Sequence, residues 1–139
     1  MNFIKYIKLL LISISCAFLF TACATTGTKD SPEAVAKEFV TAMTNADTDR
    51  FLELMDTSDI EAAELDQMRP KLETIFQMMK QELDEKGGIK SIDVVSSEIA
   101  EDGNTAQVTL KMTMGNGESE DMPPMPLKKV DGKWKVADN

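Results

Sequence analysis

Apolar residues recur every three or four positions in the first half of the chain that follows residue 30, and every second position in its last third. The first period is typical of a helix with one buried face, and the second of a strand with one buried face. The order predicts helices followed by strands. Short turns between the strands favour an antiparallel sheet covered on one face by the helices, which places the chain in the α+β class.

Three helical segments are predicted before Gly87. The first begins at Ser31, a capping residue, and Pro32 is preset for the first helical position. A short second helix follows a new capping stretch at residues 45–49. The third runs from Asp59 to Leu83, and Pro70 should kink or break it because proline lacks the amide hydrogen that a helix interior needs. The predicted buried positions are Val35, Phe39, Ala42, Met43, Ala46, Phe51, Leu52, Leu54, Met55, Leu72, Ile75, Phe76, Met79 and Leu83.

Four strands are predicted after the helix stop at Gly87-Gly88. The first covers Lys90 to Ile99, with Ile92 and Val94 on one face, and the second covers residues 106–114. The last two, Pro126 to Val130 and Lys133 to Val136, are joined by the two-residue turn Asp131-Gly132. Inward positions of the second and fourth strands are Ala106, Val108, Leu110, Met112, Met114, Trp134 and Val136.

The first 23 residues have the layout of a cleaved secretory signal: lysines, then an uncharged apolar stretch, then small residues before Cys23. The stretch is shorter than the about 20 apolar residues that span a bilayer. The cleavage site resembles a bacterial lipobox, which implies lipid on Cys23. We therefore expect a signal peptide at 1–22, a lipidated tether at 23–30 and one domain at 31–139. The alternative is cleavage after Ala24, which would release a soluble protein.

Lipid on Cys23 would hold the protein on a membrane of the cell envelope. Ala24 is not the aspartate that retains lipoproteins in the inner membrane in enterobacteria-like sorting. By this resemblance we expect the outer membrane if the organism has one, and otherwise the outer face of the plasma membrane.

Charge and cysteine content narrow the possible partners. Removing residues 1–22 takes away Lys5 and Lys8, so the net charge would go from −9 to −11. Such an acidic chain is a poor ligand for nucleic acid, and we expect none as a partner. Cys16 would leave with the signal peptide and Cys23 would be blocked, so no disulfide is expected.

Three segments resemble those of a known group of proteins. They are Ser31-Pro-Glu-Ala-Val-Ala-Lys-Glu-Phe39 at the first helix, Gly87-Gly-Ile-Lys-Ser-Ile92 opening the sheet, and Leu127-Lys-Lys-Val-Asp-Gly-Lys-Trp-Lys-Val136 closing it. Together they are similar to small bacterial lipoproteins of the nuclear transport factor 2-like (NTF2-like) superfamily, close to the domain of unknown function 4878. The resemblance implies a cone, in which a curved sheet wraps helices and a pocket opens at the wide end. It implies no single activity, because this fold hosts both enzymes and non-catalytic proteins.

Residues for acid–base chemistry are scarce. The chain has no histidine, and its single tyrosine, Tyr6, lies in the predicted signal peptide. Enzymes of this fold usually place an aspartate, histidine or tyrosine inside the cone. A buried carboxylate with a raised pKa is the alternative that the sequence leaves open. We expect a non-enzymatic protein without a cofactor.

A binding pocket is the more plausible role for the cone. Methionine is flexible and polarisable, and therefore suits a site for varied apolar ligands. The alternative is that the same residues only fill the core. The candidate pocket residues are Phe39, Met43, Val108, Leu110, Met112, Met114 and Trp134.

The segment Met122-Pro-Pro-Met125-Pro126 has three interpretations. It is an edge connection whose methionines cover the sheet, a polyproline ligand for a partner's groove, or a Cu(I) site made by the thioethers of Met122 and Met125. The first is preferred. The sequence as a whole predicts a lipid-anchored envelope protein that binds a small apolar ligand or an envelope protein, with Cu(I) binding and carboxylate catalysis as alternatives.

Overall fold

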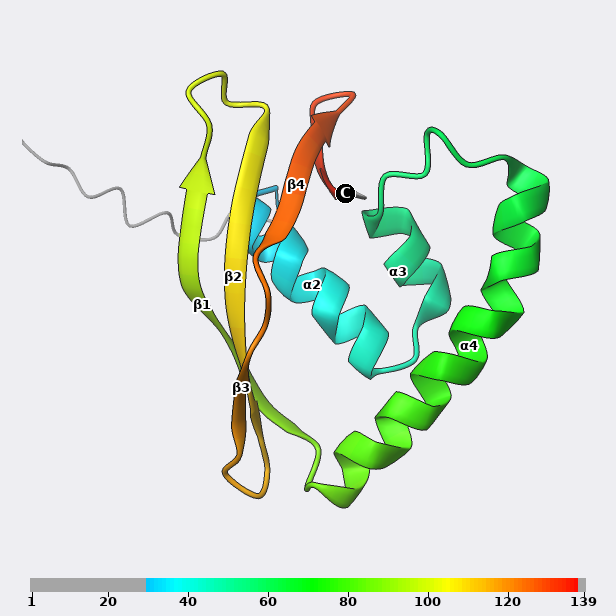
Figure 1. Cartoon of the computed structure of the whole chain (residues 1–139), viewed down its shortest axis with the longest axis vertical. Coiled ribbons are helices and arrows are strands. Elements are labelled where there is room, and N and C mark those ends of the chain that lie inside the picture. The colour runs from blue at the N-terminus through cyan, green and yellow to red at the C-terminus, as the bar shows by residue number, and fades with distance from the viewer. Residues whose placement is uncertain (1–29, 138–139) are drawn as a thin grey trace, which may run out of the picture.

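The computed structural model describes residues 30–137, which form three helices packed on an antiparallel sheet (Figure 1). The α+β prediction is confirmed. The helices are α2 (Pro32–Thr44), α3 (Thr48–Leu54) and α4 (Ala62–Glu85). The strands are β1 (Ile89–Ile99), β2 (Thr105–Met114), β3 (Ser119–Asp121), β4 (Met125–Val130) and β5 (Lys133–Val136).

The sheet is curled, and its main path runs β1-β2-β4-β5 with every neighbouring pair antiparallel. β1 is an edge strand, and two register shifts along its pairing with β2 bend it. β3 pairs with the end of β2 beyond β4, where Lys111 lies opposite Asp121. β3 was not predicted, because its three residues are all polar and exposed and show no alternation.

The helix ends follow the predicted capping chemistry. The Ser31 hydroxyl accepts a hydrogen bond from the amide of Ala34 at 3.2 Å, and the Asp47 carboxylate accepts one from Arg50 at 3.1 Å. Gly87 and Gly88 have φ angles of 88° and 73°, and the Gly88 amide donates a hydrogen bond to the carbonyl of Leu83. The predicted stop of α4 is therefore confirmed.

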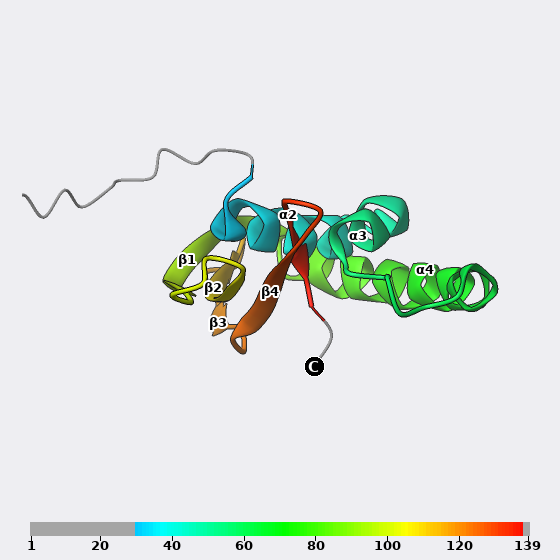
Figure 2. The ribbon, with the colours of Figure 1, turned by 90° about the horizontal axis from the view of Figure 1, so that it is seen from above.

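The path of α4 differs from the sequence expectation in two ways. The helix begins at Ala62 rather than Asp59, because residues 58–60 form a turn and bend. It also continues through Pro70, so of the expected kink or break, the break does not occur. Proline removes only one backbone hydrogen bond from a helix interior, and the 24-residue helix continues on both sides of it. Seen from above, α4 extends past the sheet rather than lying flat on it (Figure 2).

Two clusters of buried side chains hold the layers together. The main core joins one face of α2 to β2, β4 and β5, and includes the fully buried Ala36, Val40 and Val108. The second cluster joins α2, α3 and α4 through Phe51 and Phe76, whose ring centroids are 4.7 Å apart.

One predicted buried position is wrong: Ile75 on α4 is 53% exposed, because no other element covers it. On β1, Val94 is 38% exposed, although Ile92, which was predicted on the same face, packs partly against the main core. No helix in the described part of the chain has the length and apolar character needed to cross a membrane.

Candidate functional site

A cavity of about 260 Å³ lies where the C-terminal ends of α2 and α4 meet the far end of β2. Its surface is mostly apolar. Five of its lining residues are methionines, which come from four segments that are distant in the sequence. We call it the methionine cavity, and its methionines are Met43, Met79, Met112, Met114 and Met122.

The β2 wall of the methionine cavity follows from strand alternation. Val108, Leu110, Met112 and Met114 point to the same face of the sheet, as the two-residue period requires. Val108 and Leu110 are covered by α2 and are at most 1% exposed. Further along β2, Met112 is partly buried, and both it and Met114 border the cavity together with Met43 near the end of α2.

The opposite wall comes from α4 and from the segment after β3. Met79 and Leu83 are four residues apart and therefore share one helix face. Met122 follows β3, and its amide bonds the carbonyl of Leu110 at 2.8 Å, which holds the segment against β2. Pro123 then lines the cavity beside it.

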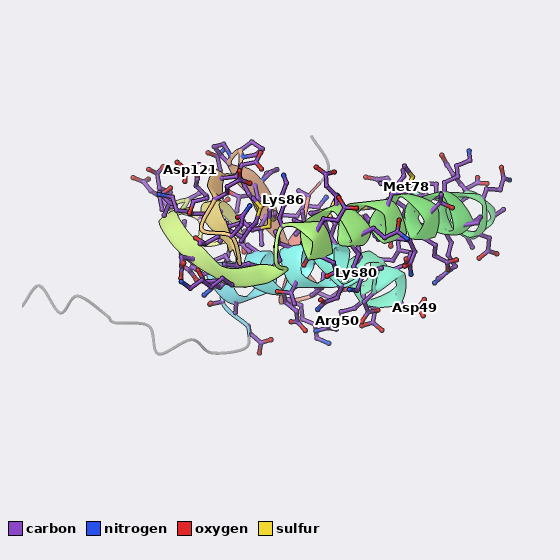
Figure 3. The ribbon with its side chains drawn as sticks, turned by 90° about the horizontal axis from the view of Figure 1, so that it is seen from below. Asp49, Arg50, Met78, Lys80, Lys86 and Asp121 are labelled. Carbon is purple, nitrogen blue, oxygen red and sulfur yellow. The ribbon has the colours of Figure 1, made fainter. Side chains whose placement is uncertain are left out.

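Three charged side chains lie around the methionines. Glu82 belongs to the last turn of α4, Lys86 is the residue that follows this helix, and Glu120 belongs to β3. Lys86 forms a loose ion pair with Glu82, with 3.6 Å between Nζ and Oε1. Figure 3 shows Lys86 at the end of α4 that meets the sheet, whereas Met78 lies on the same helix farther from the sheet. The lining therefore has an apolar sulfur-rich part and a charged edge.

The predicted pocket residues divide between the cavity and the core. Met43, Met112 and Met114 line the cavity. Phe39 does not, because its ring stacks on Phe51 with centroids 4.3 Å apart. Val108, Leu110 and Trp134 are also outside the lining and belong to the main core.

The predicted Cu(I) pair is divided in the same way. Met122 lines the cavity, whereas Met125 begins β4 opposite Val108 and lies outside the lining.

Four residues of the site were not predicted from the sequence, namely Met79, Glu82, Lys86 and Glu120. The pairing of Met79 with Leu83 on one helix face was visible in the sequence, but its position opposite Met112 was not. Cys23 lies outside the described residues.

Two carboxylates away from the cavity have shifted pKa values. Burial tends to raise the pKa of Glu33, but hydrogen bonds from Ser97, at 2.5 Å, from the backbone and from Ser31 outweigh it and lower the pKa. The ion pair with Lys128, helped by Ser58, lowers the pKa of Asp56 to about 2. A general base at neutral pH needs the opposite shift, so neither group is tuned for proton abstraction.

The other hollows are more polar or more open. A groove of about 590 Å³ between α3 and α4 is lined largely by polar and acidic side chains, including Asp47, Asp49 and Glu73. Within residues 30–137, no group of three or more histidine, cysteine, aspartate or glutamate side chains is placed to hold a metal ion. The methionine cavity is therefore the best candidate site in the described structure.

Comparison with known proteins gives a family and a fold. A family model described as "Domain of unknown function (DUF4878)" matches residues 22–137. No curated protein sequence matches the chain significantly.

Among solved structures, the chain resembles a candidate NTF2-like transpeptidase from Campylobacter jejuni with a TM-score of 0.69 and 22% identity, covering 78% of this chain and 99% of that one. At this identity the likeness shows a shared NTF2-like fold and nothing about activity. A SEC-C motif-containing protein from Rhodopseudomonas palustris matches at a TM-score of 0.46 with 17% identity, over 83% of this chain and 81% of that one, which is too low to indicate a common fold.

Proposed function

The chain belongs to the DUF4878 family and has an NTF2-like fold, and from this premise we propose that it is a non-enzymatic, lipid-anchored binding protein of the cell envelope. In this proposal the methionine cavity holds a small apolar ligand. The observation that carries it is the mostly apolar lining of a cavity that forms where the two helix ends meet β2.

The size and lining of the cavity define the ligand class. Its volume of about 260 Å³ lies just below the range of about 300–1,000 Å³ that is usual for small-molecule sites. Methionine side chains adapt to ligands of different outline because they have three rotatable bonds. A compact apolar molecule, with at most one polar end directed to Lys86, Glu82 or Glu120, therefore fits best.

The proposal of a non-enzymatic role rests on the available groups. The chain has no histidine. The carboxylates at the charged edge belong to Glu82 and Glu120, and the three charged groups there include no nucleophile with a partner base. Binding needs only the apolar lining that is present.

The envelope location is supported by the sequence of residues 1–23, which resembles a lipoprotein signal ending at Cys23. Two or three acyl chains would anchor the protein stably, since each buried CH2 contributes about 0.8 kcal/mol. The domain would then be held at the membrane surface through a short polar tether.

Mass spectrometry of the full-length gene product tests both parts of the proposal. The protein is extracted from membranes in mild detergent and measured under native and denaturing conditions. We expect the denatured mass to show loss of residues 1–22 and added lipid on Cys23. We expect the native spectrum to show a reproducible extra mass that is lost on denaturation. A native mass equal to that of the lipidated chain would contradict ligand binding and direct the search to protein partners.

A matched pair of variants assigns the ligand to the cavity. Met112→Asp places a charge on a partly buried lining residue, so the extra mass should disappear while lipid remains on the chain. Met78→Asp makes the same change at a residue that is 66% exposed and lies outside the cavity, so its extra mass should persist. Retention of the ligand by a folded Met112→Asp protein would refute the cavity assignment.

A further inference from the structure

The five methionines of the cavity bring an unusual concentration of one donor atom into one place. The chain contains ten methionines, and five of them line a cavity whose lining includes eleven residues in all. Their sulfurs come from α2, α4, β2 and the segment after β3. Only the tertiary structure brings these segments together.

We propose that the methionine cavity is a binding site for Cu(I), with thioether sulfurs of Met43, Met79, Met112, Met114 and Met122 as the available ligands. Thioethers are soft, uncharged ligands, and among metal ions in proteins they select Cu(I). Hard cations prefer oxygen, and zinc prefers thiolate or imidazole. The described residues offer no histidine or cysteine at this site.

Most of these methionines are only partly buried, which suits a metal site better than complete burial in the core would. Met43, Met112 and Met122 pack partly against the main core and are neither fully buried nor fully exposed. They therefore border open space while the core fixes the backbone that carries them. A methionine side chain has three rotatable bonds, so it can turn its sulfur atom into that space.

The charge around the cavity favours a monovalent cation. Methionine ligands are neutral, so they leave the charge of Cu(I) uncompensated. Glu82 and Glu120 lie at the charged edge of the same cavity and outnumber its single cation, Lys86. The chain as a whole carries a net charge of −9, which adds to the attraction.

This inference uses the same cavity as the proposed function but a different property of it. Apolar ligands need the volume and the apolar surface of methionine, whereas Cu(I) needs its sulfur. Methionine and leucine have similar volume and apolarity, so Met→Leu removes the sulfur and largely keeps the apolar surface. The two proposals can therefore fail separately.

Titration with Cu(I) under anaerobic conditions tests the inference. The full-length chain is used, with Cys16→Ser and Cys23→Ser in every protein so that no thiolate competes for the metal. The site variant is Met112→Leu with Met122→Leu. The control is Met78→Leu with Met125→Leu, which loses the same number of sulfurs outside the cavity. Affinity is measured by competition with a chromophoric Cu(I) chelator, and the ligand atoms are identified by X-ray absorption.

We expect one Cu(I) per chain with a coordination shell of sulfur, and the same affinity in the control. The site variant should bind at least about tenfold more weakly, the lower limit of what loss of a supporting group costs a metal site. An absence of stoichiometric binding, equal losses in the two variants, or a shell of nitrogen and oxygen would each overturn the inference. The extra native mass described above is measured separately on the natural chain, so a failure of Cu(I) binding leaves the test of apolar-ligand binding untouched.

Discussion

At the scale of single residues, Gly115 allows a close approach of two backbone segments at the edge of the methionine cavity. A Cβ added to Gly115 would stand 2.2 Å from the carbonyl oxygen of Gly87, where no atom fits. The two turns are also joined by hydrogen bonds, with Gly115 donating to Gly88 and Asn116 donating to Lys86. Gly115 therefore allows the turn after β2 to lie against the turn after α4, next to Lys86 and Met114.

Replacing Gly115 with alanine should destabilise the protein by about 1–3 kcal/mol, the usual cost of overpacking. The two turns must separate, because the atoms in conflict with the new Cβ belong to backbone. Chemical unfolding of the full chain measures the change. Gly88→Ala is the control: its φ of 73° adds about 1–2 kcal/mol of strain, but no atom lies within 4 Å of the new Cβ. Only Gly115→Ala should also weaken binding of the ligand proposed for the neighbouring cavity, and equal binding in both variants would contradict the predicted separation of the turns.

At the scale of elements, α4 is the least embedded of the three helices in residues 30–137. Of its 24 residues only Phe76 and Leu83 are buried, and Met78 and Ile75 are largely exposed. The half that follows Phe76 borders the cavity, whereas the half that contains Pro70 carries mainly exposed side chains. The stability of that first half must therefore depend more on helix propensity than on packing.

Pro70→Ala should stabilise the protein by roughly 1–3 kcal/mol, since alanine restores an amide donor and relieves the clash of the proline ring with the preceding turn. The thermal unfolding midpoint should rise accordingly. Lys71→Ala, a change at an adjacent exposed position, should alter stability by no more than about 0.5 kcal/mol. If both variants had the same midpoint, Pro70 would not limit the stability of α4.

At the scale of the whole molecule, an ion pair joins the segment after α3 to the sheet. Asp56 follows α3, and its carboxylate pairs with the ammonium of Lys128 on β4 while Ser58 donates to it at 2.6 Å. The Asp56 amide also bonds the carbonyl of Val136 on β5 at 2.8 Å. Its side chain is only 7% exposed, although Lys128 is 40% exposed. This junction closes the far edge of the sheet against the helices.

Asp56 should make the stability of the protein depend on acid pH. The pKa of Asp56 is lowered from 3.8 to about 2 in the folded state. As the pH falls, its carboxylate is therefore protonated at a higher pH in the unfolded state than in the folded state. The stabilisation is fully present above about pH 4 and is lost as the pH falls through about 2. Urea unfolding of the natural chain and of Asp56→Asn should therefore differ at pH 7 and converge towards pH 2.

Asp121→Asn provides the matched control for this pH dependence. Asp121 is 65% exposed and lies 3.4 Å from Lys111, so removing its charge should change stability little at any pH. A constant gap between the natural chain and Asp56→Asn from pH 7 to pH 2 would show that Asp56 acts through its hydrogen bonds rather than through its charge.

Local chemistry made much of the fold predictable from sequence. Ser31, Asp131-Gly132 and Gly87-Gly88 sit at element ends because their backbone preferences and side-chain hydrogen bonds act within a few residues. The alternation along β2 likewise placed Met112 and Met114 on the inner face. β3 and the exposure of Ile75 were missed, because both depend on which element lies opposite, and that is decided by packing.

The sequence by itself determined the α+β class, the ends of most elements and the inner face of β2, since periodicity and capping are local properties. The tertiary structure alone decided that four inner residues, Phe39, Val108, Leu110 and Trp134, are core and that Met79 and Met122 belong to the site. A cavity exists where packed elements diverge: α2 covers Val108 and Leu110 and ends before Met112 and Met114. That divergence arises from the lengths and directions of α2, α4 and β2 in space, which no pattern along one segment records.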